Sequence, residues 1–491
     1  MVRGPWLAAS CTALAASLGC GPLEVSHGPP AAEPPLSRPR SPEVEGRSPE
    51  GPITLEKAVD IALSNYPAIR SARARIDAAR AGESLARTAY LPRLDLLWQE
   101  LRTTRNNISG VLFPQPVIPA ISGPVSDGAS WDSAWGSAGG ALLSFEPFDF
   151  GLRGASVEAA RAAARQASAE AEVTRLEVAT TAAEAFLALL TAQETVRAAQ
   201  GNVDRRLVFV QSVHALVDQQ LRPGVDASRA DAQLAQAQIQ LAQAQHAQAV
   251  ARATLAEALG LPQGPIALTV DAGPLLDLPF QRRVPPLDFN VHPFTRSQQQ
   301  AIETVRAREK ALDSAYYPKV LLQAAANGRG SGFDFAGRTL DEDDGLLPDR
   351  GNWAVGVSVV FSPLDYFPLK ARRAVEEGNE EAERARLDQL LVSLKAQDTR
   401  VRSALEAALS VAEKTPIQLK SAQDAHTQAT TRYETGLGTV TDVAETQQLL
   451  AQAEIDDAVA RVSVWRALVA AARLQGDIAP LLETMARTPG K

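Results

Sequence analysis

Residues 352–361, NWAVGVSVVF, alternate between bulky apolar and small side chains. Trp353, Val355, Val357 and Val359 fall on one face of an extended chain, because successive side chains of a strand point to opposite faces. Alternation over about ten residues predicts a strand at about 352–362. Similar segments, separated by loops rich in Gly, Pro and Asp, predict three more strands. These strands are expected at about 91–102, 134–146 and 319–327.

The rest of the chain is rich in Ala, Gln, Glu and Arg, a composition typical of helices. Residues 151 to about 220 lack proline and predict one helix of roughly 100 Å. A sharp turn and a shorter return helix at about 226–259 follow it. Valines recur every seven residues in the long segment, at Val196, Val203, Val210 and Val217. This period predicts left-handed coiling against a neighbouring helix.

The chain is a tandem duplication. FEPFD at 145–149 matches FSPLD at 361–365, LAQA at 234–237 matches LAQA at 450–453, and Gly260 matches Gly476, always 216 residues apart. The proline pair Pro67 and Pro92 also returns, at equal spacing, as Pro293 and Pro318. Such a fixed period defines repeated structural units. The predicted domains are a first repeat at 54–260, a joint at 261–291, a second repeat at 292–476 and a tail at 477–491.

Four strands of about ten residues have the length of membrane-spanning strands. Open sheet edges cannot face lipid, and a closed barrel needs about eight strands. Several chains would therefore share one barrel. The alternative is a pair of soluble hairpins that cap a helical bundle.

The N-terminal segment predicts export. Residues 1–20 contain a basic start and a short apolar run typical of a signal peptide, with the only two cysteines at Cys11 and Cys20. SLGC at 17–20 resembles a lipoprotein cleavage box, which would make Cys20 the lipidated first residue; ordinary signal-peptide cleavage is the alternative. Residues 21–52 are rich in proline and predict a disordered linker.

The composition argues against several other functions. A net charge of −8 does not favour nucleic-acid binding. The five histidines are scattered without metal-ligand spacing, and no phosphate loop or nucleophile elbow is present in the sequence. We therefore expect no enzyme activity, no cofactor and no metal site.

The chain resembles the TolC-type outer-membrane efflux proteins over residues 54–476. The resemblance rests on ITLEKAVDIALSNYPAIRSARARIDAAR, AYLPRL, FEPFDFG, RPGVDASRADAQLAQAQIQLAQA and YETGLGTVTDVAETQQLLAQA, in this order. It implies a mixed, mainly α fold: a homotrimer with a twelve-stranded transmembrane β-barrel and a periplasmic α-barrel of long coiled helices. It also implies an outer-membrane exit duct that is not an enzyme. Such a duct works with a periplasmic adaptor (membrane fusion protein) and an inner-membrane pump of the RND or ABC type.

The two turns that precede the return helices contain the candidate site. Asp226 and Asp442 are expected to act as helix N-caps, which is the purely structural alternative for both residues. The resemblance assigns Asp442 and Glu445 to acidic rings at the periplasmic mouth, where repetition in a trimer would favour cations. It also implies a gate latch in which Tyr433 hydrogen-bonds Asp226.

Gly438 stands where the family often has a basic residue that strengthens the latch, and Arg222 is the candidate substitute. The resemblance implies that the adaptor contacts the tips of the turns. These tips are Arg222, Pro223 and Gly224 in the first repeat, and Gly436, Leu437 and Gly438 in the second.

Two further possibilities concern cargo and class. A protein-secretion duct is the main rival within the class, and only two methionines with no clustered histidine argue against a dedicated copper or silver conduit. A lipid-anchored periplasmic scaffold of coiled helices, without a conducting pore, is the alternative from another class.

Overall fold

The computed structural model describes residues 51–104, 131–261, 268–271, 285–333, 338, 340–341 and 343–486. All of these residues belong to one compact unit, Ser48–Lys491. The expected signal peptide at 1–20, with Cys20, lies outside the described residues. So do nearly all of the expected linker at 21–52 and parts of the expected joint at 261–291.

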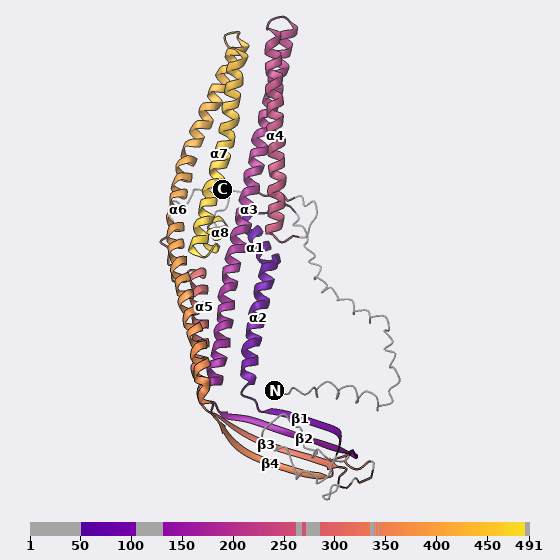
Figure 1. Ribbon diagram of the computed structural model, residues 1–491. Coiled ribbons are helices and arrows are strands. Elements are labelled where there is room, and N and C mark those ends of the chain that lie inside the picture. Colours follow the sequence, from indigo (N-terminus) through magenta and orange to yellow (C-terminus); the bar gives the residue numbers. More distant parts are fainter. Residues whose placement is uncertain are drawn as a thin grey trace, which may run out of the picture. The chain divides into compact units, whose positions relative to one another are not determined.

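Each repeat contains a short helix, two strands, a long helix and a return helix (Figure 1). The first repeat consists of α1 (Leu55–Asn65), α2 (Pro67–Thr88), β1 (Arg93–Thr104), β2 (Ser133–Phe148), α3 (Leu152–Asp218) and α4 (Gly224–Ala258). The second consists of α5 (Pro293–Ser314), β3 (Lys319–Ser331), β4 (Arg350–Val360), the 3₁₀ helix η2 (Pro363–Asp365), α6 (Tyr366–Glu434) and α7 (Val440–Gln475), and α8 (Ala479–Ala486) follows. This mainly helical fold with four strands confirms the fold class expected from the sequence.

The four strands form one antiparallel sheet in the order β1-β2-β3-β4. The central pair, β2 and β3, joins the two repeats. Among the described residues, β1 pairs only with β2 and β4 only with β3. The sheet therefore has two open edges, whose backbone N–H and C=O groups are available to another strand.

One face of the sheet is apolar and exposed. Trp353 lies opposite Ala326, Ala326 opposite Ala141, and Ala141 opposite Leu96, so these residues share a face. The same face carries further exposed apolar side chains, namely Leu94, Trp98, Leu143, Leu322, Val355, Val357 and Val359. The opposite face of β4 has only small or polar residues between Asn352 and Ser358. The sheet is thus amphipathic, and the apolar side chains of its bulky face are exposed.

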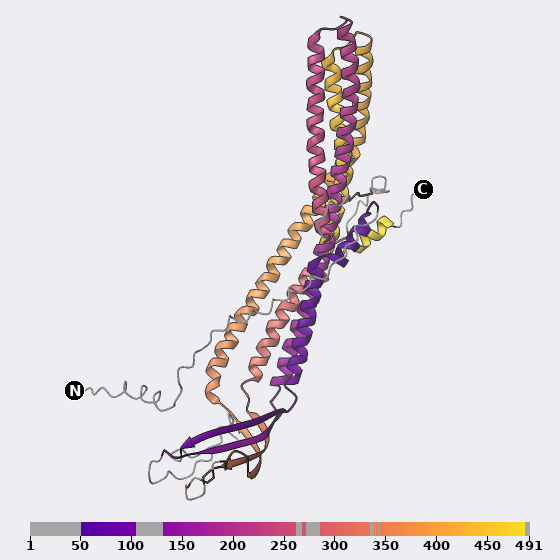
Figure 2. The same cartoon turned by 90° about the vertical axis from the view of Figure 1, so that its right-hand side faces the viewer.

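Each long helix packs against two shorter helices. Helix α3 contacts α4 along one part of its length and α2 along another, and α6 contacts α7 and α5 in the same way (Figures 1 and 2). The main core lies between α1, α3, α4 and α7, around the fully buried Phe186, Leu190 and Leu255. No described helix is both long enough and apolar enough to cross a membrane.

Two equivalent glycines let the return helices end against the short helices. Gly260 and Gly476 have φ angles of 64° and 83°, which residues with a side chain rarely adopt. A Cβ atom on Gly260 would lie 3.0 Å from the Cα atom of Tyr66, and one on Gly476 would overlap the ring of Pro293. The end of each return helix therefore sits beside the start of the helix that proline opens.

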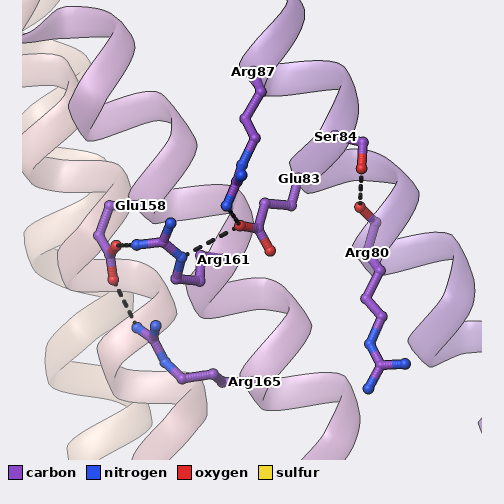
Figure 3. Close-up of polar contacts among 7 residues, drawn as sticks. All are labelled: Arg80, Glu83, Ser84, Arg87, Glu158, Arg161 and Arg165. Atoms are coloured by element: carbon purple, nitrogen blue, oxygen red, sulfur yellow. Dashed lines mark hydrogen bonds and ion pairs between the residues drawn. The ribbon is translucent and has the colours of Figure 1, made fainter.

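Ion pairs tie each short helix to its long helix on the side near the sheet. Glu83 of α2 pairs with Arg87 at 2.7 Å and with Arg161 of α3 at 3.3 Å (Figure 3). In the second repeat, Glu309 of α5 pairs with Arg373 of α6 at 3.1 Å. Glu309 follows Pro293 at the distance at which Glu83 follows Pro67. Both repeats therefore join the two helices through an acid at the same position of the short helix, although the arginines of the long helices are not at equivalent positions.

Candidate functional site

The α3–α4 turn and the α6–α7 turn lie at the end of the helices opposite the sheet (Figure 1). Both turns close in the same way. The N–H of Leu221 donates to the carbonyl of Leu216 at 2.9 Å, and the N–H of Leu437 donates to that of Arg432 at 2.8 Å. The left-handed residue needed for this closure is Gln220 (φ 58°) in the first turn and Gly436 in the second.

The two predicted N-caps are corrected by the structure. The residue that caps α4 is Pro223, and Asp226 is the third residue of that helix. Thr439 caps α7: its hydroxyl accepts from the N–H of Asp442 at 3.2 Å, and the Asp442 carboxylate accepts from the N–H of Thr439 at 2.9 Å. This reciprocal capping box holds Asp442 at the third helical position, as the pattern Thr-x-x-Asp would have indicated.

An apolar cluster fastens the two helical hairpins together just below the turns. It combines Phe209, Val210 and Val213 of α3, Ala227 and Ala230 of α4, Tyr433 of α6, and Val440 and Val443 of α7. The rings of Phe209 and Tyr433 are 5.3 Å apart and tilted by 59°. The cluster includes Val210 of the predicted seven-residue stripe, and the neighbouring Val217 packs against it.

Arg222 connects the first turn directly to the second. Its guanidinium carbon lies 4.8 Å from the centre of the Tyr433 ring. Its Nη2 atom donates to the backbone carbonyls of Tyr433, at 3.4 Å, and Gly438, at 3.5 Å. A cation above an aromatic face, beside the carbonyls at the C-terminal end of α6, is a favourable arrangement. Arg222, the candidate substitute for a basic residue at position 438, therefore reaches Gly438 from the turn of the other repeat.

The expected hydrogen bond between Tyr433 and Asp226 is not formed. Tyr433 is 3% exposed, and its hydroxyl has no hydrogen-bond partner among the described residues. Burial raises the pKa of the Tyr433 phenol, and the charge of Asp226 raises it further against the opposite effect of Arg222. Asp226 thus acts on Tyr433 through its charge, while the direct contact between the turns comes from Arg222.

Asp442 and Glu445 lie one turn apart on α7 and are both exposed. The hydrogen bonds from Thr439 lower the pKa of the Asp442 carboxyl. Among the described residues, no ion pair involves either carboxylate. Two unpaired carboxylates on one exposed helix face, close to the turn, can attract cations.

The predicted tip residues differ in accessibility. Pro223, Gly224, Gly436 and Leu437 are exposed, whereas Gly438 is buried and a Cβ atom on it would lie 3.0 Å from the backbone N of Tyr433. Leu221, which sequence reasoning missed, is 64% exposed and is the repeat equivalent of Leu437, which is 74% exposed. The repeat offset could have identified this pair of leucines.

A polar link between the hairpins also escaped the sequence analysis. Arg205 of α3 forms a two-fold ion pair with Glu454 of α7, with N–O distances of 3.1 and 2.7 Å. His426 of α6 lies near this pair, and its pKa is lowered by burial and by the charge of Arg205, against the effect of Glu454. Among the described residues, no group of three His, Cys, Asp or Glu side chains is arranged to hold a metal ion.

Residues 58–261 match the sequence profile of the family described as outer membrane efflux protein. No curated protein sequence matches the chain.

Several solved structures share the fold over most of the chain. The CmeC outer membrane channel of Campylobacter jejuni superposes with a TM-score of 0.69 at 15% identity, covering 88% of this chain and 89% of that chain. The outer membrane protein VceC of Vibrio cholerae gives 0.67 at 18% identity, covering 86% and 96%. The outer-membrane channel OprN gives 0.66 at 21% identity, covering 86% and 89%.

The profile match covers the first repeat, and the structural likeness extends over both repeats. Residues 58–261 therefore resemble the outer membrane efflux protein family, and the chain as a whole has the fold of the outer-membrane channels.

Proposed function

We propose that three copies of this chain form the outer-membrane exit duct of a tripartite efflux or type I secretion system. The duct conducts substrates passively from a periplasmic adaptor and an inner-membrane pump to the exterior. The observation that carries this proposal is the four-stranded sheet, with two open edges and one exposed apolar face.

Open edges cannot remain unpaired in lipid, and four strands are too few to close on themselves. Pairing β4 of one copy with β1 of the next satisfies both edges in every copy. Three copies then give a twelve-stranded barrel. The apolar face, which includes Trp98, Trp353 and Val357, contacts outer-membrane lipid, and the small and polar face lines the pore.

At the other end, the turns form the periplasmic mouth. Asp442 and Glu445 repeat three times around it and favour cations. Arg222, stacked on Tyr433, holds the two hairpins of each copy together and acts as the latch. The exposed tips at Leu221, Pro223, Gly224, Gly436 and Leu437 offer a surface to the adaptor, and a pump of the RND or ABC type supplies the energy.

The experiment is purification from outer membranes, followed by electrophoresis without heating and by recording in planar bilayers. Trimers that stay intact in detergent, together with single-channel conductance, support the duct. A soluble, non-conducting rod would instead support the lipid-anchored scaffold. Deleting neighbouring pump genes and comparing export of drugs, metals and proteins distinguishes the efflux system from the secretion system.

A further inference from the structure

The two repeats are equivalent in sequence but not in their surroundings. Helix α3 packs extensively against α2, α4, α5 and α7, and also contacts α1, whereas the extensive contacts of its counterpart α6 with described α-helices are those with α5 and α7. The difference appears in single side chains: Leu176 of α3 is 5% exposed, and its equivalent Val392 of α6 is 68% exposed. Helix α6 therefore lacks the two neighbours that correspond to α5 and α7 of α3.

Helix α2 has an exposed side that is covered in its counterpart α5. Its counterpart α5 is covered on two sides, by α3 and α6, and buries Thr304 to 2% exposure. The equivalent residue of α2 is Ala78, which is exposed. In the internal repeat, α2 is equivalent to α5 and α4 is equivalent to α7. Helix α3 packs on α5 and α7, so the equivalent surface, formed by α2 and α4, is open to a further helix. The partner that fits both open surfaces is a second copy of this chain.

Inside one chain, an open pocket of about 240 Å³ lies between α3, α5, α6 and α7. Its polar lining consists of the exposed Glu184 of α3, Gln397 and Arg400 of α6, and Arg473 of α7, with the buried His292 at the start of α5. No ion pair within the described residues uses Glu184, Arg400 or Arg473. One exposed acid and two exposed arginines therefore line the same pocket.

Equivalent positions of the two repeats carry opposite charges at this pocket. Arg400 is the equivalent of Glu184, and Glu257 at the end of α4 is the equivalent of Arg473. Glu257 is exposed, and no ion pair among the described residues uses it. Within a chain, α3 packs on α5 and α7. If α6 packs in the same way on α2 and α4 of the next copy, Arg400 occupies the position that Glu184 has on α3. It then faces the Glu184 and Glu257 positions of its neighbour.

We propose that Arg400 of each subunit enters a site formed by Glu184 and Glu257 of the adjacent subunit, and that this contact defines the pairing of neighbouring helical walls. The inference rests on the trimer proposed above. The site between chains therefore brings one arginine to two acids of the neighbouring subunit. This complementarity of charge favours the correct partner surface and register.

The first test is cross-linking of the full-length protein in outer membranes with a short bismaleimide. The variant combines Glu257→Cys with Arg400→Cys, which the proposal places across the subunit boundary. Most chains are expected to shift to covalent dimers and trimers. The matched control, Glu184→Cys with Arg473→Cys, occupies the equivalent positions within one chain and is expected to remain monomeric on denaturing gels. The parent chain controls for Cys11 and Cys20.

A second test reverses one charge. Glu257→Arg is expected to lower the temperature at which the trimer dissociates in detergent, and adding Arg400→Glu is expected to restore part of that shift. Dissociation of Glu257→Arg at the parent temperature, or intersubunit products from the control pair alone, would overturn the inference. A conducting trimer without the 257–400 cross-link refutes this contact only. A monomeric, non-conducting protein refutes both the contact and the proposed duct.

Discussion

Arg222 of the first helical turn lies against Tyr433 of the second, with 4.8 Å between the guanidinium carbon and the ring centre. The same guanidinium donates to the carbonyls of Tyr433 and Gly438. One side chain thereby spans from the α3–α4 hairpin to the α6–α7 hairpin. It brings a basic group from the first turn to the backbone carbonyl of Gly438 in the second.

Removing this side chain should loosen the turns. Arg222→Ala loses a cation–π contact of about 0.5–2 kcal/mol, together with two hydrogen bonds. We expect a several-fold rise in the open probability of single channels in planar bilayers. Arg222→Lys should be intermediate, because an ammonium keeps the charge but not the planar fork. The exposed Arg229→Ala on α4 is the matched control, and equal effects of Arg222→Ala and Arg229→Ala would contradict the latch.

The Tyr433 hydroxyl provides a separate test. It is buried without a partner among the described residues, so Tyr433→Phe removes a group that costs free energy to bury. We expect unchanged gating, and stability that is unchanged or raised by about 1 kcal/mol. Channel recordings and thermal unfolding measure the two quantities. Increased opening of Tyr433→Phe would instead show that the phenol makes the hydrogen bond to Asp226 in the working trimer.

Asp442 and Glu445 should set the ionic preference of the mouth. Replacing both by Asp442→Asn and Glu445→Gln removes six charges from a trimer while keeping side-chain size. We expect weaker cation selectivity and weaker block by polyvalent cations in planar bilayers, with conductance of the open barrel otherwise retained. The exposed Glu434→Gln at the end of α6 is a control for general surface charge. Unchanged reversal potentials in a salt gradient would remove these two residues from the pore.

The capping box makes Asp442 sensitive to its neighbour. Its folded-state pKa is lowered by the hydrogen bonds from Thr439, so the stabilisation is complete above the ordinary aspartate pKa. It disappears as the pH falls through the lowered value. Thr439→Ala should cost about 1 kcal/mol and should raise the pKa of Asp442. Cation selectivity then declines at a higher pH than in the parent, whereas Thr439→Ser should behave like the parent; identical pH profiles for Thr439→Ala and the parent would argue against this.

The sequence predicted the fold well because the relevant signals are local and are repeated. Alternation around Val357 indicated a strand, and the offset that links Gly260 to Gly476 indicated two equivalent halves. The site was harder to predict. Asp226 and Asp442 were predicted to be N-caps, but each lies three residues after the N-cap in the structure. The position of the cap depends on where the turn ends, which the sequence did not define. The contact of Arg222 with Tyr433 depends on how two distant hairpins pack, which no local pattern contains.

The apolar face of the sheet yields the sharpest test of membrane insertion. Val357 is 70% exposed and shares its face with Trp353 and Val355, so it should meet lipid. An arginine near the bilayer midplane of a barrel costs about 2–4 kcal/mol per chain, and a trimer bears that cost three times. Val357→Arg should therefore abolish the trimer in outer membranes. Ser358→Arg, one residue away on the opposite face, should assemble and change conductance instead. Normal assembly of Val357→Arg with failure of Ser358→Arg would mean that the lipid and pore faces are reversed.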